Sequence, residues 1–120
     1  MKKSEKNSAS VRIILAISAE ARRDLKNIRE YISVEQESPL TAVKVIESII
    51  DRMEDLLEFP DTGSLLSPKV DFPTNYRYAK TASYLIFYRH EDNHIFVDRI
   101  IHAKRNYISV LFPELKDETQ

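Results

Sequence analysis

Two neighbouring apolar segments, Tyr84–Arg89 (YLIFYR) and His94–His102 (HIFVDRIIH), decide the fold of this 120-residue chain. The first segment is apolar at both alternating positions, which suits a central β-strand. The second has strand composition and follows the first after a turn over residues 91–93. Ahead of both, Tyr76–Thr81 is polar and alternating, which is typical of an edge strand. The sequence therefore predicts three consecutive strands in the C-terminal half of the chain.

Upstream of these strands, two amphipathic stretches predict a helical hairpin. Ser18 is suited to cap the first helix, which should end between Ser33 and Glu37. Ser38 can cap the second helix, with Pro39 at the first helical position, where a missing N–H costs nothing. The apolar positions that recur at helical spacing are Ala21, Leu25, Ile28 and Ile32 in the first helix, and Ala42, Ile46, Ile49, Met53 and Leu56 in the second.

The remaining segments complete the expected element order. Val11–Ser18 is a β-branched run of strand length ahead of the first helix. The second helix should stop at residues 59–60, because the residue before a proline avoids the α region. Ser64–Thr74 carries two prolines and is expected to be an irregular loop, and Tyr107–Phe112 a short terminal helix. The sequence predicts an α+β fold in β-α-α-β-β-β order, a two-layer sandwich with the helical hairpin packed on a mainly antiparallel sheet.

Length and composition suit one globular domain. Hydrophobic residues make up 42% of the chain and charged residues 31%, a balance that allows a soluble protein to bury a core. Residues 1–10 are polar and are expected to form a flexible N-terminal arm. The domain itself should span residues 11–112, and residues 113–120 are expected to be a frayed C-terminal tail.

Composition also limits the chemistry. The chain has no cysteine, which excludes disulfides and thiolate metal sites and favours a reducing cytoplasm. Only His90, His94 and His102 remain as soft ligands, so neither a metal nor another cofactor is expected. The apolar run Val11–Ile17 is interrupted by Arg12 and is far shorter than the roughly 20 residues of a membrane span. We therefore expect a cytoplasmic protein without a membrane partner.

The net charge of −1 hides an asymmetry along the chain. Residues 19–58 hold six Lys/Arg against ten Asp/Glu, whereas residues 76–105 hold six Lys/Arg against three Asp/Glu. Many of these charges are ordinary solvated surface. The cationic excess nevertheless coincides with the predicted sheet, where alternate side chains share a face. This pattern favours a localised surface that faces an anionic partner.

Several strings in this order resemble the RelE/ParE superfamily of bacterial toxins. The similarity begins with the helix ISAEARRDLKNIREYI and continues through the helix end LLEFPDTG. It is most specific in the paired strands YRYAKTASYLIFYR and IFVDRIIHAKRNYISVLF. The resemblance covers roughly Val11 to Phe112 and implies the toxin of a type II toxin–antitoxin system, neutralised by a cognate antitoxin. Operator DNA would be a partner only indirectly, through the antitoxin.

The superfamily divides by target. RelE-like members cut messenger RNA on the ribosome, whereas ParE-like members inhibit DNA gyrase and show no nuclease activity. The segment from Arg99 to Tyr107 looks more like the ParE branch, with an arginine, two apolar residues, His102 and the downstream Arg105. YoeB-like nucleases tend to end in adjacent His-Tyr, whereas Tyr107 here lies five positions beyond His102. Gyrase inhibition is therefore the preferred function, and ribosome-dependent mRNA cleavage is the alternative.

A nuclease without a metal needs a general base, a general acid and cations that stabilise the phosphorane. If the protein cuts RNA, the catalytic candidates are His102, Arg89, Arg105 and Tyr107. His102 suits acid and base roles because its ordinary pKa lies near neutrality. Two structural alternatives stay open. A histidine at a strand end often bonds to backbone, and Arg89 could form a structural salt bridge with Glu91, Asp92 or Asp98.

A binding module without catalysis needs only a complementary surface. The candidates for contact with the target are the cations Arg77, Lys80, Arg89, Arg99, Lys104 and Arg105. The candidates for contact with the antitoxin, which typically contributes a segment that orders on binding, are Leu25, Ile28, Ile32, Arg77, Arg89 and Tyr107. A third class, a nucleic-acid-binding regulator, is less favoured because the sequence contains no helix-turn-helix pattern.

Overall fold

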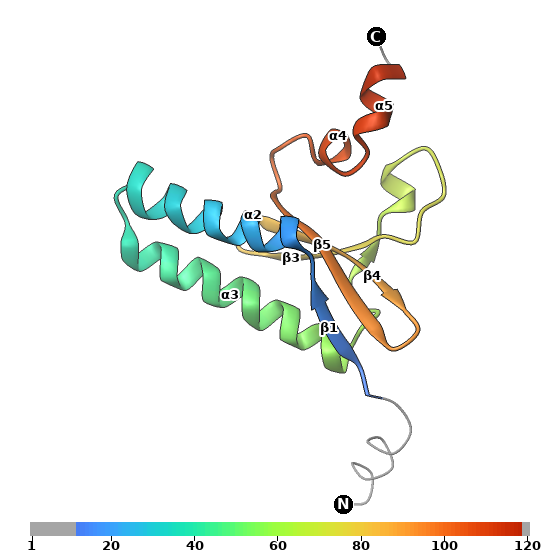
Figure 1. Cartoon of the computed structure of the whole chain (residues 1–120), viewed down its shortest axis with the longest axis horizontal. Coiled ribbons are helices and arrows are strands. Elements are labelled where there is room, and N and C mark those ends of the chain that lie inside the picture. The colour runs from blue at the N-terminus through green and yellow to red at the C-terminus, as the bar shows by residue number, and fades with distance from the viewer. Residues whose placement is uncertain (1–11, 119–120) are drawn as a thin grey trace, which may run out of the picture.

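The sheet has five strands in the order β1-β5-β4-β3-β2, and a helical hairpin lies against it (Figure 1). The computed structural model describes residues 12–118. Its elements are β1 (Ile14–Ile17), α2 (Ala19–Glu30), the π-helical turn η1 (Tyr31–Glu35), α3 (Pro39–Glu58), β2 (Ser64–Leu65), the 3-10 turn η2 (Ser67–Lys69), β3 (Arg77–Thr81), β4 (Tyr84–Glu91), β5 (His94–His102), α4 (Tyr107–Leu111) and α5 (Pro113–Glu118).

Strands β4 and β5 form the centre of the sheet, as their apolar sequences predict. They pair antiparallel from Tyr84↔His102 to Glu91↔His94, and β3 pairs antiparallel with the other side of β4. The first strand of the chain, β1, pairs with β5 in parallel. The sheet is thus mainly antiparallel, and the predicted α+β class is confirmed.

Local sequence explains how the hairpin begins. The hydroxyl of Ser18 accepts a hydrogen bond from the Ala21 N–H at 2.9 Å, so Ser18 caps α2 as predicted. The same hydroxyl donates to the Asp98 carbonyl at 2.9 Å and ties the cap to β5. Pro39 starts α3 and Ser38 is its N-cap residue, as predicted, but the Ser38 side chain makes no capping hydrogen bond. The Ser38 hydroxyl donates to the Thr41 hydroxyl instead of accepting from backbone.

The apolar stripes of α2 and α3 cover one face of the sheet. Their buried members pack with alternate residues of the central strands, among them Ile86, Tyr88, Ile95 and Val97. The opposite face of β4 is also covered. There Leu85 and Phe87 pack with residues of α4 and of the segment before β3. Residues 84–88 of β4 are therefore all buried, which is why this strand is apolar at both alternating positions.

Several segments differ from their predicted form. The region Ser64–Thr74 is not wholly irregular, because it contains β2 and η2. The strand expected at the edge, β3, carries β2 on its outer side, and β2 and β1 are the edges. The sequence predicts a frayed tail over residues 113–120, yet residues 113–118 form α5. The predicted N-terminal arm, residues 1–10, lies outside the described residues. Across residues 12–118, every helix is too short or too polar to cross a membrane.

Candidate functional site

A bulge in β5 sets the directions of the charged side chains on the sheet. The pairing steps from Phe87↔Arg99 to Tyr88↔Val97, so that Asp98 is an extra residue without a partner in β4. The Asp98 carboxylate contacts Arg89, whereas the Arg99 guanidinium contacts Asp24 on α2. The adjacent residues Asp98 and Arg99 therefore form ion pairs in different parts of the molecule, Asp98 with β4 and Arg99 with α2.

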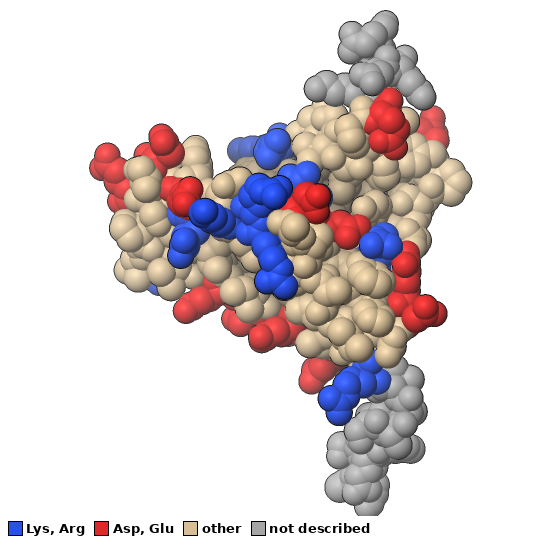
Figure 2. All heavy atoms as spheres, viewed as in Figure 1, with Lys and Arg blue, Asp and Glu red and all other residues tan. Residues whose placement is uncertain are grey.

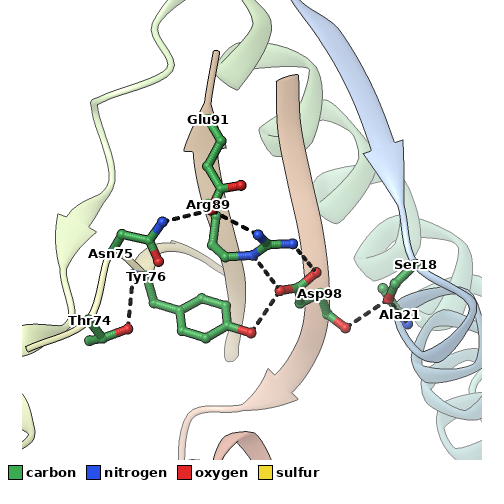
Figure 3. Close-up of polar contacts among 8 residues, drawn as sticks. All are labelled: Ser18, Ala21, Thr74, Asn75, Tyr76, Arg89, Glu91 and Asp98. Carbon is green, nitrogen blue, oxygen red and sulfur yellow. Dashed lines mark hydrogen bonds and ion pairs between the residues drawn. The ribbon is translucent and has the colours of Figure 1, made fainter. Parts of the chain in front are cut away.

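Arg89 is the centre of a polar network between β4, β5 and the segment before β3 (Figure 3). Its Nε donates to Asp98 Oδ2 at 2.9 Å and its Nη1 to Glu91 Oε2 at 2.9 Å. The Tyr76 hydroxyl donates to the same Asp98 oxygen at 2.7 Å, and Asn75 Nδ2 donates to Glu91 at 2.7 Å. The structure thus shows the ion pairs that were the structural alternative to a phosphate contact for Arg89.

The network shifts the pKa of its members. Hydrogen bonding to Asp98 raises the pKa of the Arg89 guanidinium. Burial, with the hydrogen bond to Asp98, raises the pKa of the Tyr76 hydroxyl well above its usual range. The hydrogen bonds from Asn75 and then Arg89 lower the pKa of the Glu91 carboxyl. These directions favour a charged Arg89 beside a charged Glu91 carboxylate.

The other predicted sheet arginines are also engaged. Arg77 Nη1 donates to the Gly63 carbonyl at 2.9 Å and to the Asp61 carbonyl at 3.2 Å, so that it holds the turn after α3. Arg99 is paired with Asp24, and this pairing raises the pKa of its guanidinium. In contrast, three of the predicted target-binding cations are exposed and take part in no ion pair among residues 12–118: Lys80, Lys104 and Arg105.

His102 lies at a cleft between the hairpin and the end of the sheet. The cleft has a volume of about 590 Å³ and an apolar lining that includes Ile28 and Ile32. Arg105 and the half-exposed Tyr31 also line it. The Nδ1 of His102 accepts the backbone N–H of Lys104 at 3.1 Å, the backbone bond weighed as the alternative to a catalytic role. Two predicted catalytic candidates, His102 and Arg105, thus meet two predicted antitoxin residues, Ile28 and Ile32, in one place, and Arg105 is also a predicted target-binding residue.

The structure separates the remaining members of the predicted nuclease set. His102 pairs with Tyr84 at one end of the hairpin of β4 and β5, whereas Arg89 pairs with Phe96 near the other end. Phe96 and His102 are six positions apart in β5, which corresponds to about 20 Å of extended strand. The ring of Tyr107 packs on Phe87 with centroids 5.2 Å apart, on the face of β4 opposite helices α2 and α3.

A basic surface lies on α2, on the side opposite the apolar stripe of this helix. Figure 2 shows Lys and Arg side chains gathered over this helix, whereas Asp and Glu side chains line the outer edge of α3 and the tip of the hairpin. The exposed cations of α2 are Arg22, Arg23, Lys26 and Arg29. Summed over residues 19–58 the hairpin is acidic, but the helical pattern of the sequence places these cations together on one side of α2.

Comparison with solved structures shows which class of protein has this fold. A chain of the chromosomal ParDE toxin–antitoxin system of P. aeruginosa superposes with a TM-score of 0.62 at 19% identity, over 77% of this chain and 97% of that one. A chain of the toxin–antitoxin complex RelBE2 of Mycobacterium tuberculosis superposes with a TM-score of 0.56 at 16% identity, over 77% and 99%. The fold is that of these two matched chains.

The sequence places the chain more narrowly. Residues 15–107 match the family described as the ParE toxin of the type II toxin–antitoxin system parDE, and the chain belongs to this family. No curated protein matches the sequence significantly. The predicted RelE/ParE membership is confirmed, and the protein is a toxin of a type II toxin–antitoxin system with an antitoxin as its partner.

Proposed function

We propose that this toxin inhibits DNA gyrase by binding to it, without cutting nucleic acid, and that its cognate antitoxin neutralises it by occupying the cleft beside His102. Membership of the ParE toxin family supports gyrase as the target. The observation that carries the binding mechanism is the separation of Arg89 from His102 along the central hairpin.

This separation matters because acid–base catalysis requires its groups within hydrogen-bond reach of the same substrate atoms. Arg89 lies about 20 Å of strand from His102, and its guanidinium is bound to Asp98 and Glu91. Tyr107 is packed against Phe87. A binding surface, by contrast, needs only exposed complementary groups, which Lys80, Lys104 and Arg105 provide at the end of the sheet that carries His102.

The cleft supports the second part of the proposal. Its apolar lining, which includes Ile28, Ile32 and Val45, suits an amphipathic segment that orders on binding. Its rim carries Arg105, so an antitoxin segment seated there would also cover a cation proposed to contact gyrase. The antitoxin would then neutralise the toxin by competing with gyrase for the end of the molecule that carries His102 and Arg105.

One feature keeps the RelE-like alternative open to test. His102 and Arg105 share the cleft, and together they offer a general acid/base and a cation to an RNA backbone. The two functions predict different products. Gyrase inhibition leaves messages intact, whereas ribosome-dependent cleavage leaves new message ends.

The deciding experiment assays the purified full chain in two systems. In gyrase supercoiling and cleavage-complex assays we expect inhibition, and the purified antitoxin should relieve it. On translating ribosomes, primer extension of the message should show no new ends. Cuts that depend on the toxin and vanish in the His102→Gln variant would overturn the proposal. Growth arrest on induction, with rescue by the antitoxin, should accompany the gyrase result.

A further inference from the structure

The exposed side of α2 forms a continuous cationic surface, which we call the α2 cationic face. It consists of Arg22, Arg23, Lys26 and Arg29, all exposed. From the first to the last residue these cations span about 10 Å of helix. Among the described residues, none of the four takes part in an ion pair. Their charge is therefore available to a partner (Figure 2).

The composition of this surface points to a polyanion as the partner. The other exposed residues of α2 are Ala19, Glu20, Asn27 and Glu30, so the helix offers no large apolar side chain to solvent. The large exposed apolar side chains lie elsewhere, on the hairpin tip, on and just after α3, and on the two edge strands β1 and β2. A protein interface is organised around buried apolar anchors, whereas a nucleic-acid backbone requires only well-placed cations and water.

We propose that the α2 cationic face binds the phosphate backbone of duplex DNA without reading its sequence. A short row of Arg and Lys on one helix contacts phosphates, and each contact releases a condensed counterion. The acidic side chains along α3 are repelled by the same DNA, so the molecule meets the duplex with α2 forward (Figure 2). A chain of net charge −1 can bind in this way because its charges are segregated.

The proposed DNA contact is independent of the gyrase-binding and antitoxin-binding surfaces. No residue of the α2 cationic face lines the cleft beside His102. A segment that occupies the cleft would leave these four cations exposed. The DNA contact is therefore expected both in the free toxin and in its complex with the antitoxin.

The test measures binding of the full chain to a fluorescently labelled duplex of mixed sequence by anisotropy, at salt concentrations from 50 to 200 mM. Four phosphate contacts predict a log–log slope of about −3.6, and hence about a 10²-fold loss of affinity over that range. The double variant Arg22→Gln/Lys26→Gln should bind at least tenfold more weakly at the lowest salt. Its slope should be smaller in magnitude by about 2.

A matched control removes the same amount of charge elsewhere. Lys44 on α3 and Lys69 in η2 are exposed cations outside the α2 cationic face. The variant Lys44→Gln/Lys69→Gln should bind DNA within about twofold of the wild type, and thermal unfolding should show that both double variants fold. Equal losses in the two double variants would overturn the proposal, and so would undetectable binding at the lowest salt. Polyglutamate that competes as well as unlabelled duplex of equal charge would instead assign the face to an acidic protein.

Discussion

The carboxylate of Asp24 on α2 holds both the side chain of Arg99 and the backbone beside it. Its two oxygens accept hydrogen bonds from Arg99 Nε at 2.8 Å and Nη2 at 2.9 Å. Asp24 Oδ2 also accepts the Ile100 N–H at 2.9 Å. This N–H lies beyond the residues of β5 that pair with β1. The Asp24 carboxylate thus accepts a hydrogen bond from a backbone N–H of β5 that β1 does not reach.

Replacement of Asp24 by asparagine should destabilise the fold. The side chain of Asp24 is 12% exposed and that of Arg99 is 25% exposed, so loss of the negative charge leaves a half-buried guanidinium without its counter-ion. We expect a loss of about 1–3 kcal/mol in the free energy of unfolding, measured by urea denaturation. The control Glu30→Gln, on the exposed side of α2, should change this free energy by less than about 0.5 kcal/mol. Equal stability of the two variants would contradict the role given to Asp24.

The single glycine of the chain should not tolerate a side chain. A Cβ on Gly63 would lie 2.5 Å from the Tyr88 hydroxyl and 2.9 Å from the Tyr78 carbonyl. The tyrosine cannot easily retreat, because its hydroxyl accepts the Gly63 N–H and donates to the Pro60 carbonyl. Gly63→Ala should therefore cost about 1–3 kcal/mol of unfolding free energy. The exposed neighbour variant Ser64→Ala should be close to the wild type, and a stable Gly63→Ala would disprove the close contact.

Stability should fall at alkaline pH because two buried tyrosines, Tyr84 and Tyr88, and the partly buried Tyr76 resist ionisation. Burial raises the pKa of Tyr76, Tyr84 and Tyr88 above the ordinary value near 10. Their contribution to the unfolding free energy is fully present below about pH 10 and is lost as pH rises through the raised folded-state pKa values. The Tyr76→Phe variant should lose part of this pH dependence between about pH 10 and 12. Urea denaturation across that range tests this, and an unchanged slope would contradict it.

Two arginines predicted from sequence should differ in what their loss affects. Arg105→Ala removes an exposed charge and should weaken gyrase binding by about 1–3 kcal/mol, with the unfolding midpoint unchanged. Arg89→Ala leaves Asp98 and Glu91 without their cation and should lower the thermal midpoint. Surface plasmon resonance on immobilised gyrase, together with thermal unfolding, separates the two effects. If Arg105→Ala binds gyrase like the wild type, the end of the sheet near His102 is not the contact surface.

The antitoxin should depend on the tyrosine at the rim of the cleft. Tyr31 is 53% exposed and lines the cleft, so its removal should alter binding with little effect on the core. Tyr31→Ala is expected to weaken antitoxin binding at least tenfold, or about 1.4 kcal/mol, since aromatic side chains dominate such interfaces. The control Val43→Ala removes an equally exposed apolar side chain on α3 that does not line the cleft. Isothermal titration with purified antitoxin compares the two variants, and equal affinities would move the antitoxin to another surface.

The parts of the fold that depend on local pattern could be predicted from the sequence. The apolar run 84–89 predicts β4, and the helical stripes predict α2 and α3, because each is decided by neighbours within one element. The pairing of Asp24 with Arg99 could not be predicted, since it joins residues 75 positions apart. The bulge at Asp98 could not be predicted either, because it depends on the register between β4 and β5. For the same reason, sequence could name Asp98 as one of three partners for Arg89 but could not choose among them.

The parallel pairing of β1 with β5 determines when the protein can assume its final form during synthesis. Ile14 pairs with His94 and Ile17 with Val97. The first strand, β1, therefore cannot pair until the last strand, β5, has been synthesised. Contacts between such distant segments close late and slowly. At typical elongation rates a ribosome needs on the order of ten seconds to make a chain of this length. A nascent toxin therefore stays unfinished until almost its whole length has left the ribosome, which gives antitoxin already present in the cell time to meet it before the sheet is complete.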